Sequence, residues 1–181
     1  MKIQQFEDKS LSHYSYAIIS ESVKEIVLID PARDASPYYA FAEKNAAKII
    51  AVIETHPHAD FISSHLEIHQ TTGATIYCSK LLAGDYPHEL FDDGDSIKFG
   101  DLKLKAMNTP GHSPDSISIV LEQAGKDYAV FTGDTLFIGD CGRPDLRESA
   151  GNITAKRDEL ALQMYHSLRE KLMVLNDDVV V

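Results

Sequence analysis

Thr55-His56-Pro57-His58-Ala59-Asp60 follows directly on the apolar run Ile49–Ile53. The run is short, rich in β-branched residues and continuous rather than alternating, which is typical of a strand that is buried on both faces. Two imidazoles and a carboxylate therefore stand in the loop where this strand ends and a helix is expected to begin. Borderline divalent metals favour nitrogen and carboxylate ligands, so the motif indicates a metal site. For this motif alone, ordinary polar loop residues remain the alternative.

Two later segments repeat the arrangement: Asn108-Thr109-Pro110-Gly111-His112-Ser113 and Phe131-Thr132-Gly133-Asp134-Thr135. Each places a His or an Asp in a glycine-containing turn beside a strand-like run. Three turns of this kind in one chain are hard to obtain by accident. Together they resemble the metallo-β-lactamase fold superfamily, whose pattern is HxHxD, then a PGH turn, then a GD turn.

The resemblance extends to one branch of that superfamily. Residues 136–145 read LFIGDCGRPD, which is similar to the segment that persulfide dioxygenases (sulfur dioxygenases) carry after the aspartate of the GD turn. The opening and closing parts of the chain fit this branch too, so the resemblance covers nearly the whole chain.

The branch holds one iron through the first His of HxHxD, the His of PGH and the Asp of GD. These positions are His56, His112 and Asp134 here, so the resemblance implies that these three are the catalytic metal ligands for one Fe(II) per chain. Two imidazoles and one carboxylate on one face of the metal leave the other positions open to O2 and substrate. Such a ligand set also accepts Zn or Mn.

The same resemblance implies supporting residues around the metal. His58 and Asp60 would hold ligands and waters in place by hydrogen bonds without touching the metal, and Asp30 would brace the metal-binding loop. For Asp30, a strand-ending aspartate in a turn before a proline is the alternative interpretation.

Arg143 and Cys141 are the candidate substrate-binding residues. The resemblance places the Arg of the CGR segment at the cleft for the thiol, and a guanidinium offers a planar donor fork for a carboxylate. A surface Arg that pairs with Asp140 or Asp145 is the alternative. Cys141 would line the same pocket, or it would be a buried structural thiol.

Phe61 is the departure that separates the hypotheses. Dinuclear zinc hydrolases of the superfamily read HxHxDH, and Phe61 stands where their last His binds the second metal. The resemblance therefore favours a mononuclear Fe(II) dioxygenase that oxidises the sulfane sulfur of a low-molecular-weight thiol persulfide, such as glutathione persulfide, to sulfite with O2. The alternatives are a zinc thioester hydrolase of glyoxalase II type and a catalytically idle module that serves as a partner domain.

The resemblance also bears on partners. Members of the branch are often fused to rhodanese sulfurtransferase domains, which suggests a functional link to such an enzyme in sulfide detoxification. Homodimers are common in the branch, so the resemblance suggests a homodimer as one option for this chain. The remaining histidines, His13, His65, His69, His88 and His166, lie off the motif positions and are expected to be surface or packing residues.

Composition limits the class of protein. The 181 residues, of which 44% are hydrophobic, predict one domain over 1–181. A formal net charge of −11 argues against nucleic acid or an anionic membrane face as partner. No apolar run approaches the roughly 18 residues that a membrane span needs, and the polar start of the chain favours a cytoplasmic location. Free thiols are expected for Cys78 and Cys141.

The pattern along the chain predicts an α/β fold with two sheets sandwiched between helices, the αββα architecture of the family. The last expected helix covers about 154–175 and packs the stripe Leu160, Met164, Leu168 and Leu172 against the core. Earlier helices are expected from Ser36, as the cap, to Ala47 and from Phe61 to Thr72, the second ended by Gly73. Residues 177–181 read as a strand just entering, so the fold is expected to lack its C-terminal end. The strands are expected at 3–6, 14–19, 25–29, 49–53, 74–78, 96–99, 102–106, 116–121 and 128–131.

Overall fold

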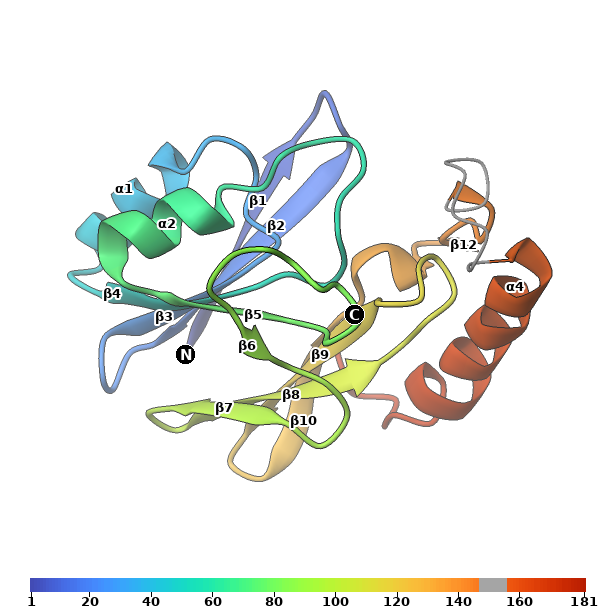
Figure 1. The fold of residues 1–181 in the computed structure, drawn as a ribbon. Coiled ribbons are helices and arrows are strands. Elements are labelled where there is room, and N and C mark those ends of the chain that lie inside the picture. Colours follow the sequence, from blue (N-terminus) through green and yellow to red (C-terminus); the bar gives the residue numbers. More distant parts are fainter. Residues whose placement is uncertain (147–155) are drawn as a thin grey trace.

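The computed structural model describes residues 1–146 and 156–181, and two sheets dominate it (Figure 1). The first sheet has the strand order β1-β2-β3-β4-β5-β6. Pairing is antiparallel from β1 to β3 and parallel from β3 to β6. Its strands are β1 (Lys2–Asp8), β2 (His13–Ser20), β3 (Glu25–Ile29), β4 (Lys48–Ile53), β5 (Thr75–Cys78) and β6 (Glu89–Leu90).

The second sheet is antiparallel throughout, with the order β10-β9-β8-β7. At its outer edge Val180 forms an isolated parallel bridge to Ala129, where the expected entering strand meets β10. A separate ribbon pairs two short strands that follow the GD turn. The bounds are β7 (Ser96–Phe99), β8 (Leu102–Asn108), β9 (Ile117–Gln123), β10 (Lys126–Phe131), β11 (Leu136–Phe137) and β12 (Asp140–Cys141).

Helices cover both outer faces of the paired sheets. The helices α1 (Ser36–Lys44) and α2 (His65–Thr72) lie on the first sheet, and α4 (Arg157–His166) with the π-helical segment Ser167–Leu172 lies on the second (Figure 1). Three apolar clusters correspond to the three interfaces of these four layers. The αββα architecture is therefore confirmed, and the stripe of the last helix packs inward with Leu160, Met164 and Leu172 buried.

The core clusters follow from alternation along the strands. Ile18 and Val27 face the cluster between the sheets, whereas their neighbours Ile19 and Leu28 face the cluster under α1 and α2. Both faces of these strands are buried, which explains their continuous apolar sequence. In the described residues, 1–146 and 156–181, no helix is both long and apolar enough to cross a membrane.

Several helix boundaries differ from the expectation. Ser36 lies inside α1 without capping it, because its N–H bonds to Asp34 Oδ1 and Ala35 occupies the cap position. The helix ends at Lys44 rather than Ala47, since the Asn45 side chain bonds to the Phe41 carbonyl and Ala46 has a φ of +49°.

The second and last helices are also shorter than expected. Residues 61–64 are not helical and α2 begins at His65, although Gly73 does end it in the left-handed conformation. The last helical segment ends at Leu172 rather than Leu175. The expected start near 154 lies outside the described residues. The strands β6, β11 and β12 were missed because each has only two residues.

Strand direction brings the three motif turns to one edge of the sandwich. Because β8 and β10 both run antiparallel to β9, they run in the same direction and end on the same side. The N–H of Ile117, at the start of β9, donates to the carbonyl of Thr55 just after β4 at 2.8 Å. This bond ties the two sheets together beside the motif. Cys78 and Cys141 are both unpaired, as expected.

Candidate metal centre

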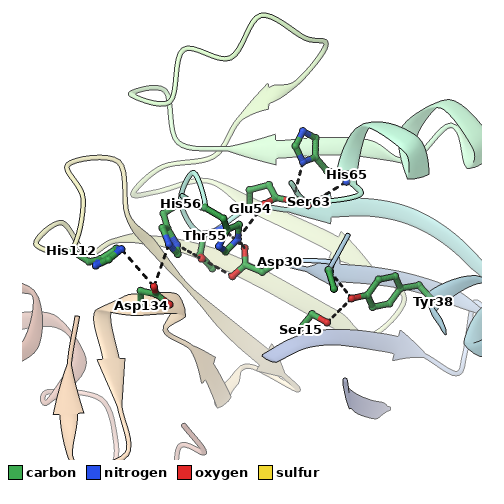
Figure 2. Close-up of polar contacts among 12 residues, drawn as sticks. Ser15, Asp30, Tyr38, Glu54, Thr55, His56, Ser63, His65, His112 and Asp134 are labelled. Atoms are coloured by element: carbon green, nitrogen blue, oxygen red, sulfur yellow. Dashed lines mark hydrogen bonds and ion pairs between the residues drawn. The ribbon is translucent and has the colours of Figure 1, made fainter. Parts of the chain in front are cut away.

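Three side chains from three turns converge at this edge. His56 follows β4, His112 lies in the turn between β8 and β9, and Asp134 lies in the short 3₁₀ helix Gly133–Thr135 after β10. One ligand atom of each lies within 4.8 Å of the other two. The Nε2 atoms of both imidazoles lie 3.6 Å from Asp134 Oδ2. Figure 2 shows both rings pointing toward this carboxylate. The structure therefore brings the three expected ligands together.

The orientation of the His56 ring is set by a chain of hydrogen bonds that begins at Asp30. The Thr55 hydroxyl donates its proton to Asp30 Oδ2 at 2.6 Å. The hydroxyl oxygen of Thr55 also lies 3.0 Å from His56 Nδ1. Because its own proton goes to Asp30, this oxygen accepts a hydrogen bond from His56 Nδ1–H. This tautomer leaves Nε2 as an acceptor that faces Asp134, which is the form a metal requires.

His112 is oriented in the same way by the backbone. Its Nδ1–H donates to the carbonyl of Arg143 at 3.2 Å, which makes Nε2 the acceptor nitrogen. Two acceptor nitrogens and a carboxylate oxygen then face one another, an arrangement that needs a cation between them. The donor set thus fits a divalent metal ion.

Protons and a metal ion would compete for these atoms. Burial alone would raise the pKa of Asp134, but the imidazoles of His56 and His112 outweigh it and hold that pKa below its ordinary value. A metal ion in the same place supplies the positive charge instead and releases such protons. The Asp134 side chain is 44% exposed, so the group is open to solvent on one side.

Two glycines allow the turns to approach this closely. A Cβ on Gly142 would lie 1.9 Å from the Asp134 carbonyl oxygen and 2.9 Å from His112 Cβ. Gly133 has a φ of +50°, and its Cβ would lie 2.4 Å from Thr55 Oγ1. Side chains at either position would push the three motif turns apart.

A second group of the same residue types lies behind the first. His58 Nε2 lies 3.3 Å from Asp30 Oδ1 and 3.4 Å from Glu54 Oε2. The side chains of His58, Asp30 and Glu54 are only 7%, 6% and 3% exposed. Burial disfavours the charged ring, but the two carboxylates outweigh it and raise the pKa of His58 to about 10. The pKa of Glu54 is lowered to about 2 by His58 and His65, against the opposing effect of burial.

A model of the metallo-beta-lactamase superfamily matches residues 10–181. The chain belongs to this superfamily. Human "Persulfide dioxygenase ETHE1, mitochondrial" is 31% identical over 180 residues, which are 98% of this chain and 65% of the relative. The cytoplasmic hydroxyacylglutathione hydrolase of Arabidopsis thaliana is 37% identical over 134 residues, 72% of this chain and 52% of the relative. The chain thus spans less than two thirds of the length of these curated relatives.

Solved structures of the superfamily agree with the fold. A metallo-beta-lactamase from Staphylococcus aureus superposes with a TM-score of 0.89 at 36% identity, covering 98% of this chain and 54% of the other. ETHE1 from Myxococcus xanthus gives a TM-score of 0.84 at 31% identity, covering 99% of this chain and 74% of the other. Persulfide dioxygenases are thus among both the sequence relatives and the structural neighbours of this superfamily member.

The remaining candidate residues of this superfamily chain lie in different surroundings. Asp30 braces the loop, because it accepts bonds from both the N–H and the hydroxyl of Thr55. Asp60 is exposed and belongs to neither group of metal-type side chains found in the described residues. Their roles toward a metal stay predictions.

The two substrate-binding candidates lie beside the His112 end of the site. Arg143 forms a two-pronged ion pair with Asp145, at 2.7 and 2.6 Å, and its side chain is 62% exposed. Cys141 is partly buried, and its backbone N–H donates to Asp140. Contact of either residue with a substrate remains a prediction.

Of the second group only Glu54 was missed from the sequence, since Asp30 and His58 were both expected as supporting residues. Glu54 is buried, accepts a bond from Ser63 at 2.6 Å and lies 3.3 Å from His65 Nδ1. A signal was available, since Glu54 directly follows the buried strand and stands four residues before His58. A charged side chain at that point cannot reach water easily and needs a partner nearby.

Proposed function

We propose that this chain is a mononuclear Fe(II) persulfide dioxygenase. The substrate would be a low-molecular-weight thiol persulfide, such as glutathione persulfide, and the products sulfite and the thiol. The observation that carries the proposal is the group of two imidazoles and one carboxylate, the ligands of an Fe(II) facial site, with the carboxylate of Asp134 open to solvent. The persulfide dioxygenase relatives at about 31% identity support it.

The residues have distinct tasks in this proposal. Nε2 of His56, Nε2 of His112 and a carboxylate oxygen of Asp134 would hold the iron, which supplies the means to react O2 with a sulfur substrate. Both atoms of O2 join the sulfane sulfur, the sulfur–sulfur bond breaks, and water provides the third oxygen of sulfite. Thr55 and the Arg143 carbonyl keep the two imidazoles in the ligand tautomer throughout.

Arg143 is the residue proposed to recognise the anionic substrate. Its present partner, Asp145, is a neighbour in an exposed ion pair, and solvent screening leaves such pairs with little effect on stability. A carboxylate of the thiol could therefore replace Asp145 on the guanidinium fork at little cost. The backbone carbonyl of Arg143 accepts a hydrogen bond from His112, so the proposed substrate-binding residue is adjacent to a proposed metal ligand.

A zinc thioester hydrolase is the second candidate, because hydroxyacylglutathione hydrolases are also similar to this chain. That chemistry uses two metals to generate and aim a hydroxide. Phe61 offers no ligand atom, and its ring packs on the His58 ring with centroids 4.4 Å apart. Asp60 is exposed rather than turned to the centre. These two observations favour the mononuclear site.

Oxygen uptake decides between the two functions. The chain is loaded anaerobically with Fe(II), glutathione persulfide is added, and O2 consumption and sulfite are measured together. We expect sulfite in step with O2, and the loss of both in His112→Ala. The matched control is His166→Ala, whose ring is exposed and bonds to Glu170. Absence of uptake with iron bound, together with thioester hydrolysis by the zinc form, would overturn the proposal.

A further inference from the structure

His58 lies beside the candidate metal centre but is directed away from it. The His56 and His58 rings are only 4.4 Å apart between centroids, so the second imidazole of the motif is within reach of the site. Its Nε2 nevertheless points to Asp30 and Glu54, at 3.3 and 3.4 Å. The Nε2 atom of the ring is thus held by two negative charges outside the ligand group.

Glu54 and Asp30 both face His58 but differ in their other contacts. Asp30 is already committed to the Thr55 N–H and hydroxyl, and through them to His56. Glu54 makes no such link to a ligand among the described residues; its Oε1 receives Ser63 and faces His65 while its Oε2 faces His58. The main contact of Glu54 toward the motif loop is therefore the His58 ring.

Aromatic rings close the pocket that holds His58. Phe61 packs on it at 31° between ring planes, and His13 meets it edge-on with centroids 5.5 Å apart. His13 and Phe61 also contact each other at 4.5 Å. The pocket thus combines two carboxylates at one end of the ring with ring packing on its faces, which fixes a single orientation.

We infer that Glu54 is a positioning residue that holds His58 off the metal and so limits the ligand set to His56, His112 and Asp134. With His58 released, a third imidazole could join the centre and occupy a position that O2 or substrate needs. The inference rests on the metal site of the proposed function, but not on the reaction that the site performs. It assigns a specificity role to a side chain that does not touch the metal.

The test counts imidazoles on the metal, using Cu(II) as the probe and pulsed electron paramagnetic resonance on one-equivalent samples. Two imidazoles are expected in the parent chain. Glu54→Gln keeps the shape of the side chain and removes one of the two negative charges that face His58. A third imidazole is therefore expected on the Cu(II) ion. The double variant Glu54→Gln, His58→Ala should return the count to two. Ser63→Ala is the matched control, because it removes a bond to Glu54 but leaves the carboxylate charge and the contact with His58.

His58→Ala alone keeps the inference testable if Glu54→Gln fails to fold. The count should remain two, since the ring that is removed was not a ligand. A drop to one, a count of two in folded Glu54→Gln, or three in the parent would each overturn the inference. A second Cu(II) ion bound to the parent chain when two equivalents are supplied would do the same, because Asp30, Glu54 and His58 would then form a site themselves. No metal binding at all would instead contradict the metal centre, which separates that failure from this one.

Discussion

The group His56–His112–Asp134 and the group Asp30–Glu54–His58 use the same kinds of side chain at nearly the same spacing. Their contacts are 3.6 Å in the first group and 3.3–3.4 Å in the second. They differ in burial and in the ratio of charges. The first has two imidazoles for one carboxylate and opens to solvent at Asp134, whereas the second has two carboxylates around one imidazole and is buried.

The difference determines what each group can do. In the buried group His58 contacts both carboxylates, Thr55 and Ser63 donate hydrogen bonds to them, and His65 adds a contact to Glu54, so each carboxylate has partners inside the protein. In the open group both imidazoles present acceptor nitrogens, and the compensating charge has to come from outside. Similar residue types thus give a structural anchor in one place and a binding site in the other.

The largest expected effect comes from removing one carboxylate from each group. Asp30→Ala leaves the Thr55 N–H and hydroxyl without their acceptor and His58 with one carboxylate, so the metal-free chain should lose about 3–5 kcal/mol of unfolding free energy. Asp134→Ala should change that free energy by less than about 1 kcal/mol. It should weaken metal binding more than about 100-fold, which exceeds the usual effect of losing a residue that only hydrogen-bonds to a metal ligand. Urea unfolding and chelator competition measure the two quantities.

Asp60→Ala is the control for stability, because its carboxylate is exposed and should change the unfolding free energy by no more than about 0.5 kcal/mol. Equal losses of stability in Asp30→Ala and Asp134→Ala would show that the two groups do not differ in the way argued above.

A smaller effect is expected at the close contact between the CGR segment and the open group. In Gly142→Ala the added methyl would overlap the Asp134 carbonyl oxygen and crowd His112. The turn must shift, so metal affinity should fall about 10- to 100-fold while the sandwich remains folded. Gly139→Ala is the matched control, since nothing lies within 4 Å of its Cβ position and its φ of +81° costs only local strain. Equal affinity in both variants would contradict the tight packing at Gly142.

The fold was largely predictable because the burial of a strand or helix determines the pattern of apolar residues in its sequence. The runs Ile26–Ile29 and Ile49–Ile53 are apolar without alternation since both faces of the first sheet are covered. Gly73 marked the end of α2 through its left-handed conformation. The start of α2 was not predictable in this way, because the conformation of residues 61–64 is set by tertiary contacts. Phe61 packs on His58, and Ser63 donates to Glu54. Such contacts leave no periodic signal.

The site was predictable in part for a related reason. The resemblance placed His56, His112 and Asp134, and the strand directions that gather them are implied by the αββα order. Asp30 and His58 were expected as supporting residues, but their contact through Glu54 was not foreseen, since Glu54 reads as the polar end of a strand. Only the three-dimensional arrangement shows that the chain is still inside the protein at that residue.

The smallest expected effect concerns the ring that covers His58. Phe61→Ala removes contacts with the His58 and His13 rings and should lower the unfolding free energy by about 1–2 kcal/mol. Phe137→Ala, at an exposed position on β11, should change it by less than about 0.5 kcal/mol. The number of imidazoles on Cu(II) should stay the same in Phe61→Ala, because Asp30 and Glu54 still hold His58 by charge. A third imidazole on Cu(II) in Phe61→Ala would show that ring packing, and not Glu54, keeps His58 away from the metal. Glu54 would then only pair with the charge of His58.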